Sequence, residues 1–282
     1  MRKMWSIRIR AHPVCRSGRS KRRFECGHAG RLRPLNNRLK TFYTKHPMKF
    51  DRRASDFLDS VVSLKLRTAV FDCDGTLWGP DAGEGFLEWE LERGLVAGDT
   101  ARRIRARYAD YKAGRVPEDV MCGEMVTMHA GLLNDDLDRA AEEYFGQYIE
   151  PGIFPEMQEL TGKLNDQGCA VWAVSSSNDW VIQAGMRRFG IPREHVLATA
   201  VAIDNGRATD RLLRIPSGEG KPHAIRTHIR TQVDAAFGNS KWDEAMLEIA
   251  QHSFAVNPTA DLERAAKKHS WNIYFLDSTG KK

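Results

Sequence analysis

Two carboxylates stand two residues apart at the end of a short, mostly apolar run. The segment DCDGT, residues 72–76, contains Asp72 and Asp74. Paired carboxylates that leave a strand together can face the same crevice, where nucleophilic or acid–base chemistry becomes feasible. Gly75 permits a tight turn, and Thr76 adds a hydroxyl and an amide. This segment is the strongest chemical signal in the sequence.

A run of three serines follows a second apolar segment, residues 169–174. Ser175 supplies a hydroxyl, and exposed amides at the start of a helix suit a phosphate group. Serine runs also cap helices, so for Ser176, Ser177 and Asn178 capping is an equal alternative to ligand contact.

The third cluster is the segment GNSKWD, residues 238–243, after the apolar residues 235–237. Asn239 and Asp243 supply two oxygen ligands four residues apart, beside a glycine turn. Lys221 lies between the second and third clusters, after a glycine-rich turn. An isolated lysine at a helix start is usually solvated, so Lys221 gains weight only from its neighbours in this series.

The elements that must position these residues alternate between strands and helices. We expect strands at residues 68–72, 169–174, 235–237, 253–256 and 272–276, and a hairpin at residues 196–203 and 208–215. We expect helices at residues 55–66, 155–167, 178–189, 221–231, 242–250 and 259–269. This alternation predicts an α/β fold with a doubly wound, Rossmann-like parallel sheet, whose ligands bind beyond the carboxyl ends of the strands.

The chain divides into three parts that differ in charge and in hydrophobic pattern. Residues 1–47 are basic and lack helical or strand periodicity, so we expect a disordered arm. Residues 48–80 and 150–282 are expected to form the catalytic core. Residues 81–149 are wholly helical in pattern and are expected to form a small cap, inserted after the first strand.

The clusters resemble, in their order, the four motifs of haloacid dehalogenase-like hydrolases. The matching blocks are residues 72–76, Ser175, Lys221 and residues 238–243. The resemblance covers residues 66–278. The helical insert and the tail AVNPTADL, residues 255–262, are similar to the phosphoserine phosphatase-like branch of that superfamily.

The resemblance implies a Mg²⁺-dependent phosphatase with an aspartyl-phosphate intermediate. Asp72 would attack phosphorus, and Asp74 would protonate the leaving oxygen and later activate water. The implied phosphate-binding residues are Thr76, Ser175, Ser176 and Lys221. The implied Mg²⁺ ligands are Asp72, the main-chain carbonyl of Asp74, Asn239 and Asp243.

Three features of the resemblance carry alternatives. Many members have aspartate where this chain has Asn239, so we expect a weaker Mg²⁺ site. Asp81 and Glu84 lie where the branch places an acid for a substrate amine, but first-turn carboxylates that favour the helix dipole are the preferred interpretation. The cap arginines either bind a substrate carboxylate or lie on a solvated helix face. These arginines are Arg102, Arg103, Arg105, Arg107 and Arg115.

The net charge of +6 conceals two opposite parts. Residues 1–47 carry +13 and residues 48–282 carry −7. We therefore expect no nucleic-acid partner for the body of the protein. The arm is interpreted as an over-extended translation start, with a targeting peptide or a nucleic-acid-binding tail as alternatives.

Other classes are excluded by what the sequence lacks. No run of 18 apolar residues occurs, so no membrane span is expected. No Gly-x-x-x-x-Gly-Lys-Ser/Thr occurs, which excludes a P-loop. Five widely spaced cysteines indicate reduced thiols and a cytoplasmic setting.

The expected partner is a small phosphorylated metabolite, and phosphoserine is the first substrate that the resemblance suggests. A phosphotransferase or dehalogenase on the same fold is an alternative, although the acid at Asp74 disfavours the dehalogenase. A third alternative is a catalytically weakened protein that binds a phosphate ligand, because Asn239 gives the metal site one negative charge fewer than an aspartate would.

Overall fold

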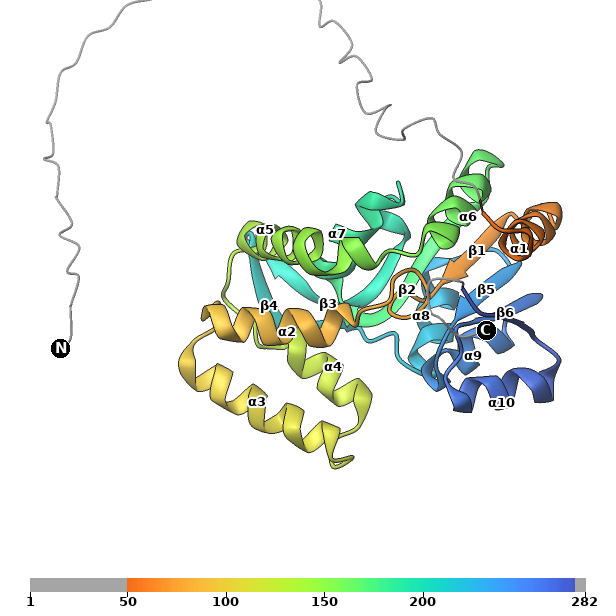
Figure 1. Cartoon of the computed structure of the whole chain (residues 1–282). Coiled ribbons are helices and arrows are strands. Elements are labelled where there is room, and N and C mark those ends of the chain that lie inside the picture. The colour runs from red at the N-terminus through yellow and green to blue at the C-terminus, as the bar shows by residue number, and fades with distance from the viewer. Residues whose placement is uncertain (1–49, 277–282) are drawn as a thin grey trace, which may run out of the picture. The chain divides into compact units, whose positions relative to one another are not determined.

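A seven-stranded sheet organises the computed structural model, which describes residues 50–276 (Figure 1). The strand order is β4-β3-β2-β1-β5-β6-β7. The strands are β1 Thr68–Phe71, β2 Ala170–Asn178, β3 Val196–Asp204, β4 Arg207–Arg214, β5 Ala235–Gly238, β6 His252–Val256 and β7 Asn272–Tyr274. Every neighbouring pair is parallel except the hairpin of β3 and β4. The predicted doubly wound α/β fold is confirmed.

The central strand β1 is buried on both faces, which its apolar sequence favours. Phe71 packs in one apolar cluster with residues of α1, α5, α6 and α7, whereas Val70 packs in another with residues of α8, α9 and α10. Successive side chains of a strand point to opposite faces, so these two clusters lie on the two faces of the sheet. Both faces are covered by helices, as a mostly parallel sheet requires.

The helices follow the alternation that the sequence predicts. Those that accompany the sheet are α1 Arg52–Ser63, α5 Asn134–Tyr144, α6 Pro155–Asp166, α7 Asp179–Arg188, α8 Gly220–His228, α9 Glu244–Glu248 and α10 Ala260–His269. A π-helical turn, Phe145–Ile149, follows α5, and short 3₁₀ turns lie at Glu150–Gly152, Arg193–His195 and Lys241–Asp243. The helix predicted at 242–250 is therefore a 3₁₀ turn followed by the short α9.

Three helices, α2 Ala82–Arg93, α3 Gly98–Lys112 and α4 Glu118–Thr127, gather beside the sheet (Figure 1). They share an apolar cluster of their own, which includes Leu87, Ile104 and Met121. Helix α5, which we placed in the cap from sequence, instead contributes Leu137 and Ala141 to the cluster that covers the sheet. The boundary of 81–149 for the cap thus stays a prediction, and residues 50–276 belong to one compact unit.

Strand β2 is longer than its apolar run suggested. It continues through the three serines to Asn178, and its register against β3 shifts between Ser175 and Asn178. Such a bulge re-aims side chains at a sheet edge. Helix α7 begins only at Asp179, where the Asn178 side chain accepts a hydrogen bond of 3.0 Å from the amide of Val181. Capping, one of the two alternatives for Asn178, is confirmed.

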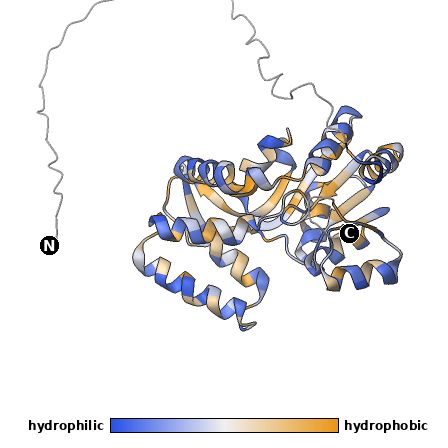
Figure 2. Ribbon diagram, viewed as in Figure 1, coloured by the Kyte–Doolittle hydropathy of each residue, from blue (hydrophilic) through white to orange (hydrophobic). Residues whose placement is uncertain are grey.

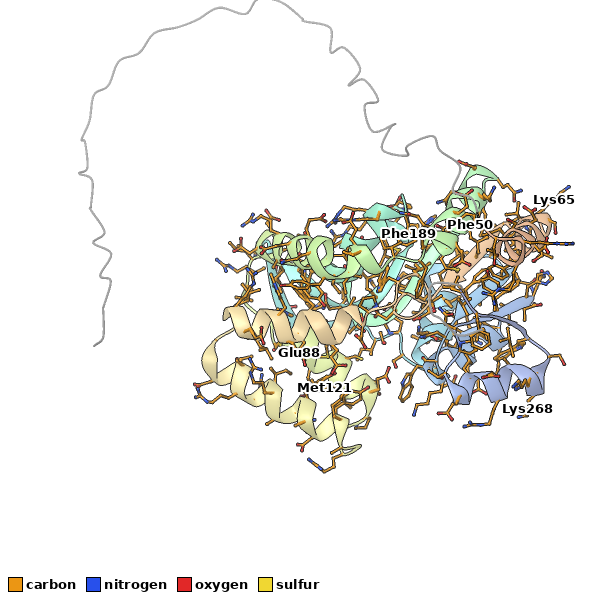
Figure 3. All side chains as sticks on the ribbon, in the orientation of Figure 1. Phe50, Lys65, Glu88, Met121, Phe189 and Lys268 are labelled. Atoms are coloured by element: carbon orange, nitrogen blue, oxygen red, sulfur yellow. The ribbon has the colours of Figure 1, made fainter. Side chains whose placement is uncertain are left out.

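Apolar residues concentrate on the inward side of the elements (Figure 2). Phe189 is buried, whereas Lys65 and Lys268 are exposed at the rim (Figure 3). None of the helices between residues 50 and 276 combines the length and apolarity that a bilayer crossing requires. The predictions for residues 1–47, including the basic arm with Cys15 and Cys26, lie outside the described residues.

Candidate active site

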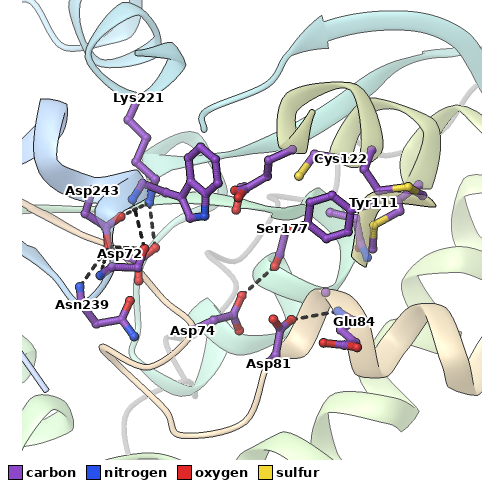
Figure 4. A pocket seen from close by; sticks show the side chains of 18 of the residues that line it. Asp72, Asp74, Asp81, Glu84, Tyr111, Cys122, Ser177, Lys221, Asn239 and Asp243 are labelled. Atoms are coloured by element: carbon purple, nitrogen blue, oxygen red, sulfur yellow. Dashed lines mark hydrogen bonds and ion pairs between the residues drawn. The ribbon is translucent and has the colours of Figure 1, made fainter. Parts of the chain in front are cut away.

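A cavity of about 240 Å³ opens where the carboxyl ends of β1, β2 and β5 meet the helices α2, α3 and α4 (Figure 4). Because parallel strands end at the same edge of the sheet, the three polar clusters converge there. Those of the predicted site residues that line the cavity are Asp72, Asp74, Ser176, Lys221, Asn239 and Asp243.

Asp72 is fixed at the end of β1 by its neighbours. Its amide donates to the carbonyl of Phe237 on β5 at 2.8 Å. Its Oδ2 accepts a hydrogen bond of 3.0 Å from the Thr76 hydroxyl, and its Oδ1 accepts one of 2.7 Å from Lys221 Nζ. Burial, followed by the nearby Asp243 carboxylate, raises the pKa of Asp72 to about 6, with Lys221 opposing the rise. Two fixed donors therefore hold this buried carboxylate in one orientation.

Lys221 is a buried cation shared by two carboxylates. Its side chain is 1% exposed, and Nζ donates to Asp72 Oδ1 at 2.7 Å, to Asp243 Oδ1 at 2.6 Å and to the Val174 carbonyl at 2.9 Å. Burial opposes its charge, but the carboxylates of Asp243 and Asp72 keep the pKa of Lys221 above its ordinary value. The ammonium group therefore stays charged at the point where a phosphoryl group would meet Asp72.

Asp74 points away from Lys221, toward helix α2 (Figure 4). Its Oδ1 accepts from the indole of Trp78 at 2.6 Å and from the amide of Ala82 at 2.8 Å. Its Oδ2 accepts from the Ser177 hydroxyl at 2.6 Å. Burial, followed by the charge of Asp81, raises the pKa of Asp74 to about 7, although the bonds from Ser177 and Ala82 oppose the rise. A carboxyl group with this pKa can both donate and accept a proton near neutrality.

The loop after β5 packs directly against the loop after β1. A Cβ atom added to Gly75, which has φ of +78°, would lie 1.8 Å from Nδ2 of Asn239. Asp243 holds the loop, because its Oδ2 accepts from the amides of Asn239 and Ser240, each at 2.9 Å. Since Oδ1 of Asp243 accepts from Lys221, both of its oxygens are engaged. Asp243 is also fully buried, whereas Asn239 is only partly buried, so Asn239 is the more accessible of the two to a metal ion.

The serines of β2 divide between two environments. Ser175 is buried, its Oγ accepts from the amide of Ser177 at 3.1 Å, and it is not among the residues that line the cavity. Ser176 and Ser177 both line it. Thr76 is likewise fully buried behind Asp72. Two of the four residues predicted to bind phosphate, Ser176 and Lys221, therefore lie at the cavity surface.

The contact between Ser177 and Asp74 is not predicted from the sequence, where helix capping and ligand contact are equal alternatives for Ser177. No local sequence pattern predicts this contact, because it depends on the register shift between β2 and β3. The indole of Trp78 was missed for a similar reason: it turns back toward Asp74 within the loop that follows β1.

The cap side of the cavity is formed by side chains of α3 and α4. They are Tyr108, Tyr111, Glu118, Met121, Cys122 and Met125. Glu118 is buried, and burial raises its pKa, while a hydrogen bond from Ser217 opposes the rise. No sequence pattern distinguishes Glu118 from the other acids of the cap, since it is a first-turn carboxylate of helix α4.

Asp81 is the N-cap of helix α2 and Glu84 lies in its first turn, the positions that the preferred interpretation predicts. Oδ1 of Asp81 accepts a hydrogen bond of 2.8 Å from the amide of Glu84, and Glu84 forms an ion pair with Lys112 at 3.0 Å. Both acids also line the cavity. Among the described residues, none of the cap arginines lines it.

Comparison with known proteins places the chain in a family. The family model for haloacid dehalogenase-like hydrolases matches residues 69–248. A protein of Neisseria meningitidis (serogroup C, strain 8013) named histidinol-phosphatase is 26% identical over 216 residues, which cover 73% of this chain and 96% of that protein. A protein of Mycobacterium tuberculosis (strain H37Rv) named phosphoserine phosphatase is 30% identical over 144 residues, or 49% of this chain and 46% of that protein.

A solved structure shares the fold. A Bordetella pertussis Tohama I protein described as having unknown function superposes with a TM-score of 0.66 at 24% identity, covering 74% of this chain and 98% of that one. This likeness confirms the fold. The chain belongs to the haloacid dehalogenase-like hydrolase family, which it shares with enzymes named as phosphatases.

Proposed function

We propose that the protein is a Mg²⁺-dependent phosphatase that hydrolyses a small phosphomonoester through an aspartyl-phosphate on Asp72. The observation that carries the proposal is the buried Lys221, which donates to Asp72 at 2.7 Å at the edge of the cavity. A charged lysine beside a carboxylate nucleophile can neutralise the phosphoryl oxygens as charge develops on them.

The residues present fit Mg²⁺, which prefers hard oxygen ligands and keeps several waters. We assign the ligands to Asp72, the main-chain carbonyl of Asp74 and the side-chain oxygen of Asn239. The close approach of the Asn239 amide to Gly75, where a Cβ has no room, supports this set. When bound, the ion would neutralise phosphate charge. Asp243 would contribute indirectly by holding Lys221 and the loop.

The protein groups divide the reaction into two displacements. An oxygen of Asp72 attacks phosphorus, the bond from phosphorus to the leaving oxygen breaks, and Asp74 gives its proton to that oxygen. Asp74 then takes a proton from water, whose oxygen attacks phosphorus and displaces the Asp72 carboxylate. Lys221 and Ser176 hold the phosphoryl oxygens in both steps. Asp74 ends protonated, so the cycle closes with inorganic phosphate and an alcohol.

The expected substrate is a small phosphorylated metabolite, because the cavity of about 240 Å³ has room for a phosphate group and a small leaving group. Phosphoserine is the first candidate from the sequence, and the relative named histidinol-phosphatase adds an amino-alcohol phosphate. A phosphotransferase that passes the phosphoryl group to another alcohol, and a protein that binds a phosphate ligand without turnover, are the alternatives. We expect the enzyme to work in the cytoplasm.

The test measures phosphate release from p-nitrophenyl phosphate with Mg²⁺, and after chelation. Asp72→Asn should abolish turnover, and Asp74→Asn should lower kcat by about 10²- to 10⁴-fold, the usual range for acid–base catalysis. Asp204→Asn, at the exposed tip of the β3–β4 hairpin, is the matched control. Rapid acid quenching and mass spectrometry should find a phosphoryl group on Asp72.

The outcomes separate the alternatives. Turnover by Asp72→Asn, or full activity without Mg²⁺, contradicts the proposal. Phosphoryl transfer to an added alcohol faster than to water indicates a phosphotransferase. Binding of phosphate esters without turnover in the unchanged protein indicates a binding protein.

A further inference from the structure

We propose that the leaving group of the substrate carries a cationic nitrogen and no carboxylate, and that Glu118 is the specificity residue that binds this nitrogen. The inference rests on the proposed phosphatase function and names its substrate class. It would set this protein apart from an enzyme for phosphoserine, whose leaving group carries both a cation and a carboxylate.

Glu118 carries an incomplete hydrogen-bond set inside the cavity. It lies in the first turn of α4, is 8% exposed and lines the cavity. Its Oε1 accepts a hydrogen bond of 2.7 Å from Ser217. Its Oε2 is enclosed and has no partner among the described residues. A buried carboxylate oxygen without a donor is unfavourable, so a donor from the ligand would complete the set.

The position of Glu118 suits a leaving group. Ser217 belongs to the turn that leads into α8 and Lys221, so its bond to Glu118 ties the cap helix to the loop that carries the phosphate-binding cation. Because Glu118 and Asp72 line the same cavity, we infer that a small group esterified to a phosphate at Asp72 can contact Glu118.

The charges around the cavity favour a cation. Among the described residues, its lining contains six carboxylates and one cation. The carboxylates are Asp72, Asp74, Asp81, Glu84, Glu118 and Asp243. The cation, Lys221, already donates to two of them. Glu84 is paired with Lys112, and Asp243 with Lys221. Glu118 therefore lies apart from the proposed phosphoryl-transfer residues Asp72 and Asp74, and its Oε2 can accept a hydrogen bond from a ligand.

The same charges exclude a substrate carboxylate. In the described part of the chain, none of the cap arginines lines the cavity, and Arg107 and Arg115 form ion pairs with Glu124 and Asp110. A carboxylate beside the leaving oxygen would meet Asp81 and Glu118 without a compensating cation in the cavity lining. Unpaired like charges are unfavourable in a partly buried site.

The walls around Glu118 suit an organic cation as well. Tyr108 and Tyr111 present aromatic side chains, and Met121 and Met125 present thioethers to the same cavity. Aromatic faces attract ammonium and imidazolium groups, and thioethers adapt to irregular shapes. An alkylammonium or imidazolium group would find a carboxylate oxygen together with an apolar, polarisable surround.

The experiment compares kcat/KM for three esters that differ by one group. These are 2-aminoethyl phosphate, O-phosphoserine, which adds a carboxylate, and 2-hydroxyethyl phosphate, which lacks the cation. The unchanged enzyme should prefer 2-aminoethyl phosphate over each of the others by at least tenfold. Glu118→Gln keeps an acceptor for Ser217 but loses the charge. It should reduce the preference over 2-hydroxyethyl phosphate by about 10- to 100-fold, through KM, the range for a lost charge-assisted hydrogen bond.

Asp119→Asn is the matched control, because it removes the same charge from the neighbouring, exposed position of the same helix turn. It should leave the preference intact. A second measurement needs no variant: ethanolamine should inhibit p-nitrophenyl phosphate hydrolysis more strongly than ethylene glycol does. This measurement tests the preference for a cationic leaving group even if Glu118→Gln fails to fold.

The failures can be told apart. If the unchanged enzyme hydrolyses none of these esters, nor p-nitrophenyl phosphate, the proposed function itself is wrong. If it hydrolyses p-nitrophenyl phosphate but accepts O-phosphoserine or 2-hydroxyethyl phosphate as well as 2-aminoethyl phosphate, the proposed substrate class is wrong. If Glu118→Gln lowers kcat/KM equally for all three esters, Glu118 is structural and does not set specificity.

Discussion

The hydroxyl of Ser177 donates a 2.6 Å hydrogen bond to Oδ2 of Asp74, although 103 residues separate them along the chain. This bond favours the ionised carboxylate and so lowers the pKa of Asp74, against the rise to about 7 that burial dominates. Ser177 thereby lowers the pH at which the proposed acid loses its proton.

Ser177→Ala should shift the pH profile. Loss of the bond raises the pKa of Asp74, so the carboxyl group stays protonated to higher pH. The alkaline limb of kcat/KM for p-nitrophenyl phosphate should then move up by about one pH unit, as one pKa unit corresponds to about 1.4 kcal/mol. Ser60→Ala, on the exposed side of α1, should leave the profile in place. If the alkaline limb of Ser177→Ala does not move, Ser177 does not influence proton transfer by Asp74.

Asn239→Asp should strengthen the proposed metal site. It replaces a neutral amide with a carboxylate beside Gly75, and greater ligand charge raises the affinity for a divalent cation. We expect the Mg²⁺ midpoint for activity to fall by about tenfold, or about 1.4 kcal/mol. Asn165→Asp adds the same charge at an exposed position of α6 and should not alter the midpoint. Equal midpoints for Asn239→Asp and the unchanged enzyme would remove Asn239 from the ligand set.

Gly75→Ala should damage the site more than backbone strain alone explains. Gly75 and Gly114 have nearly the same φ, +78° and +72°, but an added Cβ meets Asn239 at 1.8 Å only at Gly75 and finds no atom within 4 Å at Gly114. Gly114→Ala should lower stability by about 1–2 kcal/mol and keep activity. Gly75→Ala should lose both further stability and turnover. Thermal melts and phosphate release check the pair, and equal behaviour would refute the packing argument.

Lys221→Met should destabilise the protein in a pH-dependent way. It leaves Asp72 and Asp243 buried without their cation, a change that typically costs about 3–5 kcal/mol. Without Lys221 the pKa of Asp72 rises above about 6. A raised folded-state pKa gives stability that is present at low pH and lost as pH rises through it. The loss in Tm, measured with chelator, should therefore be smaller at pH 5 than at pH 8.

The control for this variant is Lys268→Met, at an exposed position near the end of α10. It should change Tm little at either pH. If Lys221→Met lowers Tm equally at pH 5 and pH 8, the two carboxylates are not the cause of the loss.

A chain that begins at Met48 should fold and hydrolyse phosphate esters like the full chain. All proposed site residues lie within residues 50–276, and the helix before the first strand begins at Arg52. Removal of residues 1–47 changes the net charge from +6 to −7, so salt-dependent retention on DNA should disappear. A much lower Tm or lost turnover would mean that these residues support the body of the protein.

The sequence by itself determined the α/β fold, the parallel sheet and the convergence of Asp72, Asp74 and the Asn239 loop. These features follow from local patterns: apolar runs at strand spacing, glycine turns, and polar residues directly after the strands. Because parallel strands must end at one edge of a sheet, local order along the chain is enough to bring these residues together.

The tertiary structure alone decided which neighbours complete the site. It turned Asp74 toward Trp78 and Ser177, withdrew Ser175 from the cavity lining and placed Glu118 beside Ser217 with one oxygen unpaired. These contacts depend on a bulge in β2 and on the packing of α4 against distant loops. Hydrophobic periodicity fixes which face of an element is buried. The atoms that meet across two elements are set by packing between segments about 100 residues apart, which no local pattern encodes.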